Sequence, residues 1–313
     1  MALTFNSLHT AYQEHTSDTT AANVTIGKNR INDTHKELLA MHDWYFAETT
    51  ATFTPTASTY SYNLPYNFGR AIAIRVDVDD VHYVLEEVAS HEEWQKLQMY
   101  RDTQTSNYPT HYHITGDTFE IYPIFSTTTA SNLGTIHYVK RVVDMQYDDY
   151  TTSTASITNG ATALTSAAAV WTASFVGRYF KINTGARWYE ISARVSDTAL
   201  TLKKSYQEAT ASAESYTIGE IPIIPEDYHN LLYYQPVAQY WMMKKDTNQA
   251  AYYQALYDKG KKEFFNAYSK RTSSQILNPI GAVRRRPITA YGANRWDEPT
   301  LAWDDSNEFW GGS

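Results

Sequence analysis

Two histidines are the first residues whose spacing could support chemistry. His111 and His113 alternate along a predicted strand, so their side chains share one face, which is a workable spacing for two metal ligands. No third ligand is evident in the sequence, and two exposed strand histidines are the favoured interpretation. We therefore expect neither a metal site nor a bound cofactor.

Other candidate motifs are incomplete. The carboxylates of "DVDDVHYVLEE", residues 77–87, lack calcium-loop spacing and fit a solvated strand edge, and "SHEEW", residues 90–94, lacks the second histidine of a zinc protease helix. The sequence contains no phosphate-cradling glycine loop, dinucleotide fingerprint or nucleophile elbow. A glycosidase-like pair of distant carboxylates stays open. We predict that the protein is not an enzyme.

One sharp basic cluster, Arg284, Arg285 and Arg286, lies near the end of the chain. Guanidinium groups at this density could contact DNA phosphates or an acidic groove on a partner. A solvated surface patch explains the cluster equally well. Both interpretations stay open.

Three tryptophans in the same region recur every seven residues, at Trp296, Trp303 and Trp310. Pro299 argues against a continuous helix, and in an extended chain this interval sends successive rings to opposite sides. Each ring would then need its own pocket on a neighbour, although coincidence in a short tail explains the spacing equally well. The predicted partner-binding residues are Arg284, Arg285, Arg286, Trp296, Trp303, Phe309 and Trp310.

Composition excludes further classes of function. The 313 residues carry a net charge of −8, which argues against a general nucleic-acid binder because phosphate neutralisation needs a basic surplus. Cysteine is absent, which excludes disulfides and cysteine-ligated zinc. No signal-like start and no long apolar run are present, so we expect a soluble cytosolic product without membrane contact. The 26 tyrosines and 8 tryptophans suit surfaces that become interfaces.

The first half of the chain is predicted to be helical and then mostly β. Residues 4–44 have apolar side chains at helical spacing, and a break near residues 17–21 divides them into two helices. Strands are expected within residues 53–78, a helix over about 90–100, and a hairpin at Gly116-Asp117. We predict one small sheet for this section.

A second β section follows a shift in composition near Asp148. "ASITNGATALT" and "VGRYFKINTGARWYEI" each read as two strands around a turn, and Phe180 and Ile182 fall on one face. These short strands and regular turns predict a small barrel or sandwich from about Thr152 to Ile221.

The last ordered elements are predicted to be two helices. Pro225, Glu226 and Asp227 form a favourable first helical turn, and Asp246 has the character of an N-cap for a second helix that runs to Tyr268. After Ser273 repeated prolines and glycines break the pattern, so this tail cannot form a core of its own. Its aromatic content predicts an extended arm that docks on a partner.

These observations predict an α+β fold in four parts. Residues 1–150 contain the first helices and a small mixed sheet, residues 151–222 an inserted small β-barrel or sandwich, residues 223–272 a helix pair that packs on the first helices, and residues 273–313 the docking arm.

The order of these segments resembles the head-to-tail adaptor (connector) proteins of tailed bacteriophages. The resemblance rests on "INDTHKELLAMHDWYF", on "FTPTASTYSYNLPYNF" and on the terminal pair that begins "PEDYHNLLYYQPVAQYW". Residues 156–206 look like the small β module of some phage adaptor and tail proteins, although minimal helical adaptors lack such an insertion.

The resemblance implies a structural virion protein at the head-tail junction, assembled in the host cytoplasm. It implies a ring, usually of twelve copies, beneath the portal protein and around a channel that genome DNA passes without specific binding. It also implies that the C-terminal segment reaches the portal. Tail nozzle, tube or fibre proteins would be further partners.

Two alternatives remain at this point. The chain could be another structural tail component, such as a stopper, tube or fibre-attachment protein. A polysaccharide hydrolase that uses tyrosine and tryptophan platforms in the β section is the third and least favoured possibility.

Overall fold

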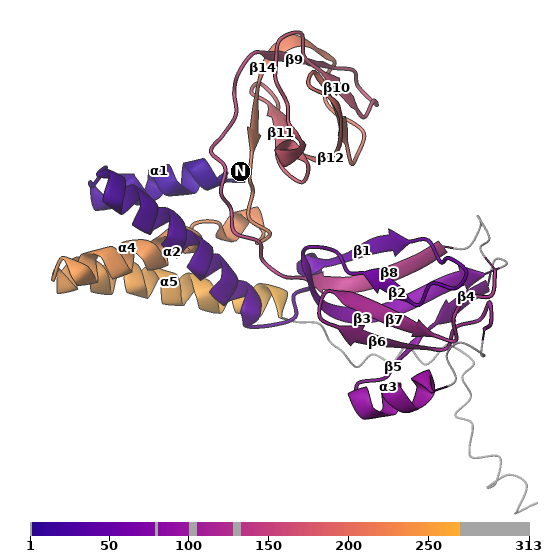
Figure 1. Cartoon of the computed structure of the whole chain (residues 1–313). Coiled ribbons are helices and arrows are strands. Elements are labelled where there is room, and N and C mark those ends of the chain that lie inside the picture. Colours follow the sequence, from indigo (N-terminus) through magenta and orange to yellow (C-terminus); the bar gives the residue numbers. More distant parts are fainter. Residues whose placement is uncertain (1, 79–80, 100–104, 128–132, 270–313) are drawn as a thin grey trace, which may run out of the picture. The chain divides into compact units, whose positions relative to one another are not determined.

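The computed structural model describes residues 2–78, 81–99, 105–127 and 133–269. It is an α+β protein, with a group of helices, two sheets and a small barrel (Figure 1). Within the described residues no helix is long and apolar enough to cross a membrane. The predicted division into four parts stays a prediction.

Helices from both ends of the described chain share one core. α1 (Phe5–Thr16) and α2 (Ala21–Ala40) pack against α4 (Leu231–Met243), which pairs with α5 (Thr247–Tyr268) (Figure 1). The predicted break between the first two helices and the predicted Asp246 cap are confirmed, since the Asp246 carboxylate accepts a 3.0 Å hydrogen bond from the main-chain nitrogen of Gln249. The centre of this core is fully buried and includes Leu8, Tyr12, Ile31, Leu38, Trp44, Leu231, Val237 and Phe264.

Two glycines allow this close packing. A side chain at Gly27 of α2 would collide with the ring of Tyr12, and one at Gly260 of α5 would collide with Leu231. The hydroxyl of Tyr12 donates a buried 2.8 Å hydrogen bond to Asn23, which also fixes α1 on α2. Any larger residue at either glycine would require the neighbouring side chain, Tyr12 or Leu231, to move.

The start of α4 differs in detail from the prediction. Glu226–Tyr228 forms a 3₁₀ turn, and the α-helix begins only at Leu231. The side chain of His229 explains the difference, because it accepts a 2.9 Å hydrogen bond from the main-chain nitrogen of Leu3 and contacts the main-chain oxygen of Ile224 at 2.8 Å. These bonds fix the turn in place before the helix starts.

The middle section forms two sheets instead of the predicted one. The first has the order β1 (Glu48–Phe53), β8 (Leu133–Lys140), β3 (Phe68–Val78), β4 (Val81–Val84); the second has the order β2 (Ser61–Asn63), β7 (Thr118–Tyr122), β6 (His111–Thr115), β5 (Glu86–Glu87). Ile74 and Ile136 of the first sheet share a buried cluster with Phe119 and Ile121 of the second. The prediction of a single sheet was wrong. Each of the two sheets has one apolar face, and stacking the sheets buries both apolar faces.

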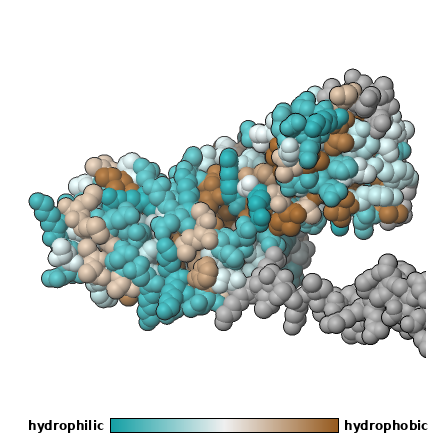
Figure 2. All heavy atoms as spheres, turned by 90° about the horizontal axis from the view of Figure 1, so that it is seen from below, coloured by the Kyte–Doolittle hydropathy of each residue, from teal (hydrophilic) through white to brown (hydrophobic). Residues whose placement is uncertain are grey.

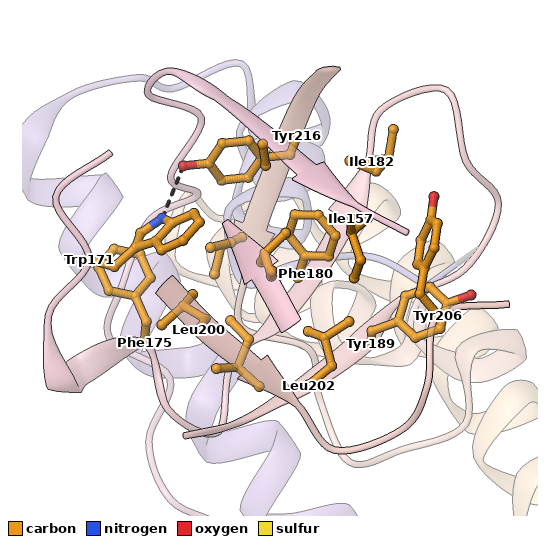
Figure 3. Close-up of a cluster of buried hydrophobic side chains, with 14 of the residues drawn as sticks. Ile157, Trp171, Phe175, Phe180, Ile182, Tyr189, Leu200, Leu202, Tyr206 and Tyr216 are labelled. Atoms are coloured by element: carbon orange, nitrogen blue, oxygen red, sulfur yellow. Dashed lines mark hydrogen bonds between the residues drawn. The ribbon is translucent and has the colours of Figure 1, made fainter. Parts of the chain in front are cut away.

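The second β section is a closed six-stranded barrel, which confirms the barrel alternative. Its order is β10 (Ala163–Thr165), β13 (Ala199–Leu202), β12 (Tyr189–Ser196), β11 (Tyr179–Ile182), β14 (Ala211–Gly219), β9 (Thr154–Ile157). Phe180 and Ile182 point into its core as predicted, and the Trp171 indole donates a 3.0 Å hydrogen bond to the hydroxyl of Tyr216 (Figure 3). The barrel therefore has a hydrophobic core separate from that of the helices.

Candidate interaction surfaces

The residues predicted to bind a partner cannot be placed. Arg284, Arg285, Arg286, Trp296, Trp303, Phe309 and Trp310 all lie outside the described residues, as does the whole predicted arm. Their roles stay predictions, and the surfaces considered below belong to residues 2–269.

The histidine pair differs from the prediction at one position. His113 is buried, because α3 (His91–Gln98) covers that face of the sheet and the Trp94 ring stacks on the imidazole with centroids 5.5 Å apart. Its Nδ1 lies 2.6 Å from the main-chain oxygen of Val88 and its Nε2 lies 3.4 Å from Nδ1 of His91. The interpretation of two exposed histidines was therefore wrong for His113.

His111 is half-buried and lies near the sheet edge. Its Nε2 is 3.9 Å from a carboxylate oxygen of Glu86, and its Nδ1 contacts the hydroxyl of Thr110 at 2.7 Å. Among residues 2–78, 81–99, 105–127 and 133–269, no group of three or more histidine or carboxylate side chains could hold a metal ion.

A polar junction joins the barrel to the segments that enter and leave it. Arg178 is only 5% exposed, and its guanidinium donates hydrogen bonds to the main-chain oxygens of Asp148 at 2.8 Å and Ile218 at 3.0 Å. The same group lies over the rings of Phe175 and Tyr147, at 5.0 and 5.3 Å from their centroids. Burial lowers the pKa of Arg178, but the hydrogen bonds and ring contacts offset the cost of removing its charge from water.

Acidic groups complete this junction. The Glu220 carboxylate accepts hydrogen bonds from the main-chain nitrogens of Gln146 and Tyr147 at 2.6 and 2.8 Å, and burial raises the pKa of Glu220. Burial also raises the pKa of Asp149, whose carboxylate accepts a 2.8 Å hydrogen bond from the hydroxyl of Thr4. Since Thr4 is the N-cap of α1, the start of the first helix is fixed on the segment that leads into the barrel.

The same leading segment is also held by α2. Asn32 donates to the main-chain oxygen of Met145 at 2.9 Å and accepts from its nitrogen at 3.1 Å, and Lys28 pairs with Asp148 at 2.5 Å. These contacts join residues more than one hundred positions apart. No sequence motif signals them, and they fix the segment that leads into the barrel on α2.

A groove of about 630 Å³ lies where the end of α2 meets β3 and β8. Its apolar lining comes from Leu39, Met41, Val139 and Val142. This volume is in the range of pockets that hold ligands or inserted side chains. No sequence pattern indicates the groove, because three segments that are distant in the chain form it.

The groove is also cationic. Four basic side chains line it: Lys36, Arg70, Lys140 and Arg141. Lys36 pairs with Asp144 at 2.5 Å, and Arg70 pairs with Asp43 at 2.6 Å. Lys140 and Arg141 make no salt bridge with any residue that the structure describes, and burial lowers the pKa of Lys140. An anion in the groove would therefore meet two unpaired cations.

Exposed apolar side chains are scattered over the surface. Figure 2 shows hydrophobic residues in patches separated by hydrophilic ones on the face seen there. Met41 and Tyr45 near the groove, and Met242 and Tyr252 on the last two helices, are among the exposed large side chains. Scattered exposed side chains of this kind are normal on a protein surface and do not by themselves mark an interface.

The match to a protein family agrees with the fold described above. The pattern of the SU10 adaptor protein family matches residues 3–173, which is 171 of the 313 residues and more than half of the chain. The matched region spans α1, α2, both stacked sheets and the first two barrel strands. No curated protein matches the sequence. The chain belongs to the SU10 adaptor protein family and is therefore a structural adaptor protein of a bacteriophage.

Proposed function

We propose that this protein is a head-to-tail adaptor that forms a ring, of twelve copies, beneath the portal protein and around the DNA channel. Family membership carries the proposal, because it identifies a phage virion component that associates with other head and tail proteins. The ring joins the head to the tail at the head-tail junction, and the protein meets its portal after synthesis in the host cytoplasm.

The shared helical core supports the proposed ring. Helices from both ends of residues 2–269 form one packed body, which suits the rigid segment of a ring subunit. In a cyclic assembly each subunit contacts its neighbours through two different patches. The barrel has its own core and would decorate the ring, where it contacts a neighbour or a tail nozzle, tube or fibre protein.

The net negative charge of residues 1–269 supports a channel through which DNA passes without specific binding. The tail from residue 270 onward contains six of the 26 basic and five of the 34 acidic side chains, which leaves residues 1–269 with 20 and 29. The body is thus acidic by nine charges, and acidic walls do not retain phosphates. The C-terminal arm supplies the predicted attachment to portal or neighbour.

Electron microscopy of the purified protein mixed with its portal tests the proposal. Class averages should show a ring coaxial with the portal, and a rotational count of twelve is expected. A ring bound only to isolated tails would favour a stopper, tube or fibre-attachment component. Turnover of a polysaccharide by the purified protein would contradict the structural role.

A further inference from the structure

We propose that the cationic groove at the end of α2 receives residues 296–310 of a neighbouring copy of this chain. The groove is defined by the basic side chains Lys36, Arg70, Lys140 and Arg141 and by the apolar side chains Leu39, Met41, Val139 and Val142. The identity of the donor copy rests on the proposed ring. The recognition between segment and groove stands on the following chemistry.

The charge of the groove is opposite to that of the body around it. Residues 1–269 are acidic by nine charges, yet four basic side chains line this one groove. Two of them, Lys140 and Arg141, have no ion-pair partner among the residues described. Lys140 is half-buried with Glu190 nearby and Arg141 is exposed, but neither makes a salt bridge with a described residue, so an incoming carboxylate would form a direct charge-assisted contact with each.

Residues 296–310 have the complementary chemistry. These fifteen residues contain five carboxylates, three tryptophans and one phenylalanine, with no lysine or arginine. Trp303 is followed directly by Asp304 and Asp305, so one short stretch offers a large ring and two anions. The indole of Trp303 suits the apolar lining of the groove, and the two carboxylates are opposite in charge to Lys140 and Arg141. A buried tryptophan next to charge-assisted pairs is the usual composition of an interface anchor.

The exit point of the chain places the segment within reach. The last turn of α5 packs against the residues that follow α2: Phe265 lies 5.9 Å from His42, and Tyr268 lies 5.9 Å from Tyr45, between ring centroids. His42 itself lines the groove. The 26 residues from 270 to 295 can span at most about 85 Å, at roughly 3.3 Å per residue. The arm can therefore reach an adjacent subunit.

We assign the segment to a neighbour because a ring needs two different patches on every subunit. An arm that leaves one copy and a groove that accepts it from the next form such a pair, and the contact closes after one full turn. Repeated around the ring, individually weak contacts would add to a stable assembly.

The absence of native cysteine makes a clean disulfide experiment possible. A chain with Met41→Cys in the groove is mixed with an affinity-tagged chain with Ala302→Cys beside Trp303, and the mixed disulfide is measured after mild oxidation. Met242→Cys replaces Met41→Cys in the control, because Met242 is 59% exposed against 38% for Met41 and does not line the groove. We expect several-fold more mixed disulfide with the groove cysteine than with the control.

Charge reversal tests the recognition itself. Asp304→Lys with Asp305→Lys should remove the excess of mixed disulfide, and adding Lys140→Glu with Arg141→Glu in the groove chain should restore it. The return of the disulfide in the charge-swapped pair excludes loss of folding as the cause of the effect. Unchanged disulfide yield with the tail variants, or a yield equal to the Met242→Cys control, overturns the proposal.

The donor copy is tested separately from portal binding. A single chain that carries both Met41→Cys and Ala302→Cys should give mostly dimers and larger products on a denaturing gel. A product that is only an internally crosslinked monomer overturns the neighbour as donor. Normal crosslinking without portal binding would instead contradict the proposed function and leave the groove contact standing.

Discussion

The guanidinium of Arg178, directly before strand β11 of the barrel, donates a 2.8 Å hydrogen bond to the main-chain oxygen of Asp148, in the segment that leads into the barrel. A second bond from the same group reaches Ile218, which lies on the strand that leads out. The side chain of Arg178 thus links the segment that enters the barrel to the strand that leaves it.

Replacing Arg178 should destabilise this junction. Arg178→Ala removes the hydrogen bond to the main-chain oxygen of Asp148, one of two hydrogen bonds to the oxygen of Ile218, and the cation near Asp149 and Glu220, so we expect a loss of about 3 kcal/mol in the free energy of unfolding. Urea unfolding at neutral pH measures it. Arg187→Ala is the matched control, because that side chain is exposed in the same barrel. Equal effects of the two substitutions would contradict the anchoring role.

Acid should destabilise the helical core through His35. This side chain is 2% exposed, its Nε2 accepts a hydrogen bond from the main-chain nitrogen of Ile223, and burial lowers its pKa from 6.5 to about 3. Because the folded-state pKa lies below the unfolded one, its contribution is fully present above pH 6.5 and falls as the pH drops below it. Between pH 7 and pH 5 the loss is about 2 kcal/mol.

Unfolding midpoints at the two pH values give the measurement. The buried carboxyls Glu220 and Asp149 have raised pKa values and act in the opposite direction, so the comparison must be made between variants. His35→Gln should flatten the pH dependence relative to the unmodified protein. An unchanged slope would show that His35 does not carry the effect.

The barrel should be removable without loss of portal attachment. Tyr150 and Ile218 exchange both main-chain hydrogen bonds, at 2.8 and 2.9 Å, so their Cα atoms, next to the ends of an excision after Thr151, lie about 5.5 Å apart. Replacing residues 152–217 by a short glycine linker should keep Glu220 in the junction. We expect such a protein to bind portal in a co-sedimentation assay; a variant that is folded by circular dichroism yet binds no portal would refute the separate role of the barrel.

Removing the tail should weaken attachment while the body stays folded. Truncation after Ile276 takes away the arginine triplet and all the C-terminal tryptophans. A buried tryptophan anchor contributes about 2 kcal/mol to an interface, so Trp303→Ala should reproduce part of the effect. Binding to portal by the truncated protein as tight as by the full chain would exclude a role of the arm in portal attachment.

The histidines of β6 should matter for packing and not for metal. His113→Ala removes the stack on Trp94 and leaves the main-chain oxygen of Val88 unpaired, which should destabilise the protein by about 1–2 kcal/mol, whereas His111→Ala should have a smaller effect. Ring assembly should survive both changes. Elemental analysis that finds a stoichiometric transition metal, lost in the double variant, would contradict this expectation.

The features predicted correctly from sequence are local ones. The cap at Asp246 needs only an aspartate before an apolar periodic stretch, and the barrel strands around Phe180 need only alternation between turns. The second sheet and the burial of His113 were missed because they depend on what covers a face, and α3 supplies that cover from another part of the chain. The groove and the Asn32–Met145 contact were missed for the same physical reason.

The barrel core comes from one continuous stretch of chain and the helical core from both ends, so the two cores can form only one after the other during synthesis. All six barrel strands lie between Thr154 and Gly219, so the barrel can close as soon as that stretch has emerged. The helical core cannot close until α5 is complete at Tyr268, since Phe264 and Tyr257 fill its centre. During that interval α1 and α2 expose Leu8, Ile31 and Leu38 to solvent, and nascent chains on one message can associate through these faces or recruit chaperones. Synthesis of the last helix is therefore the step that ends the aggregation-prone period of each newly made subunit.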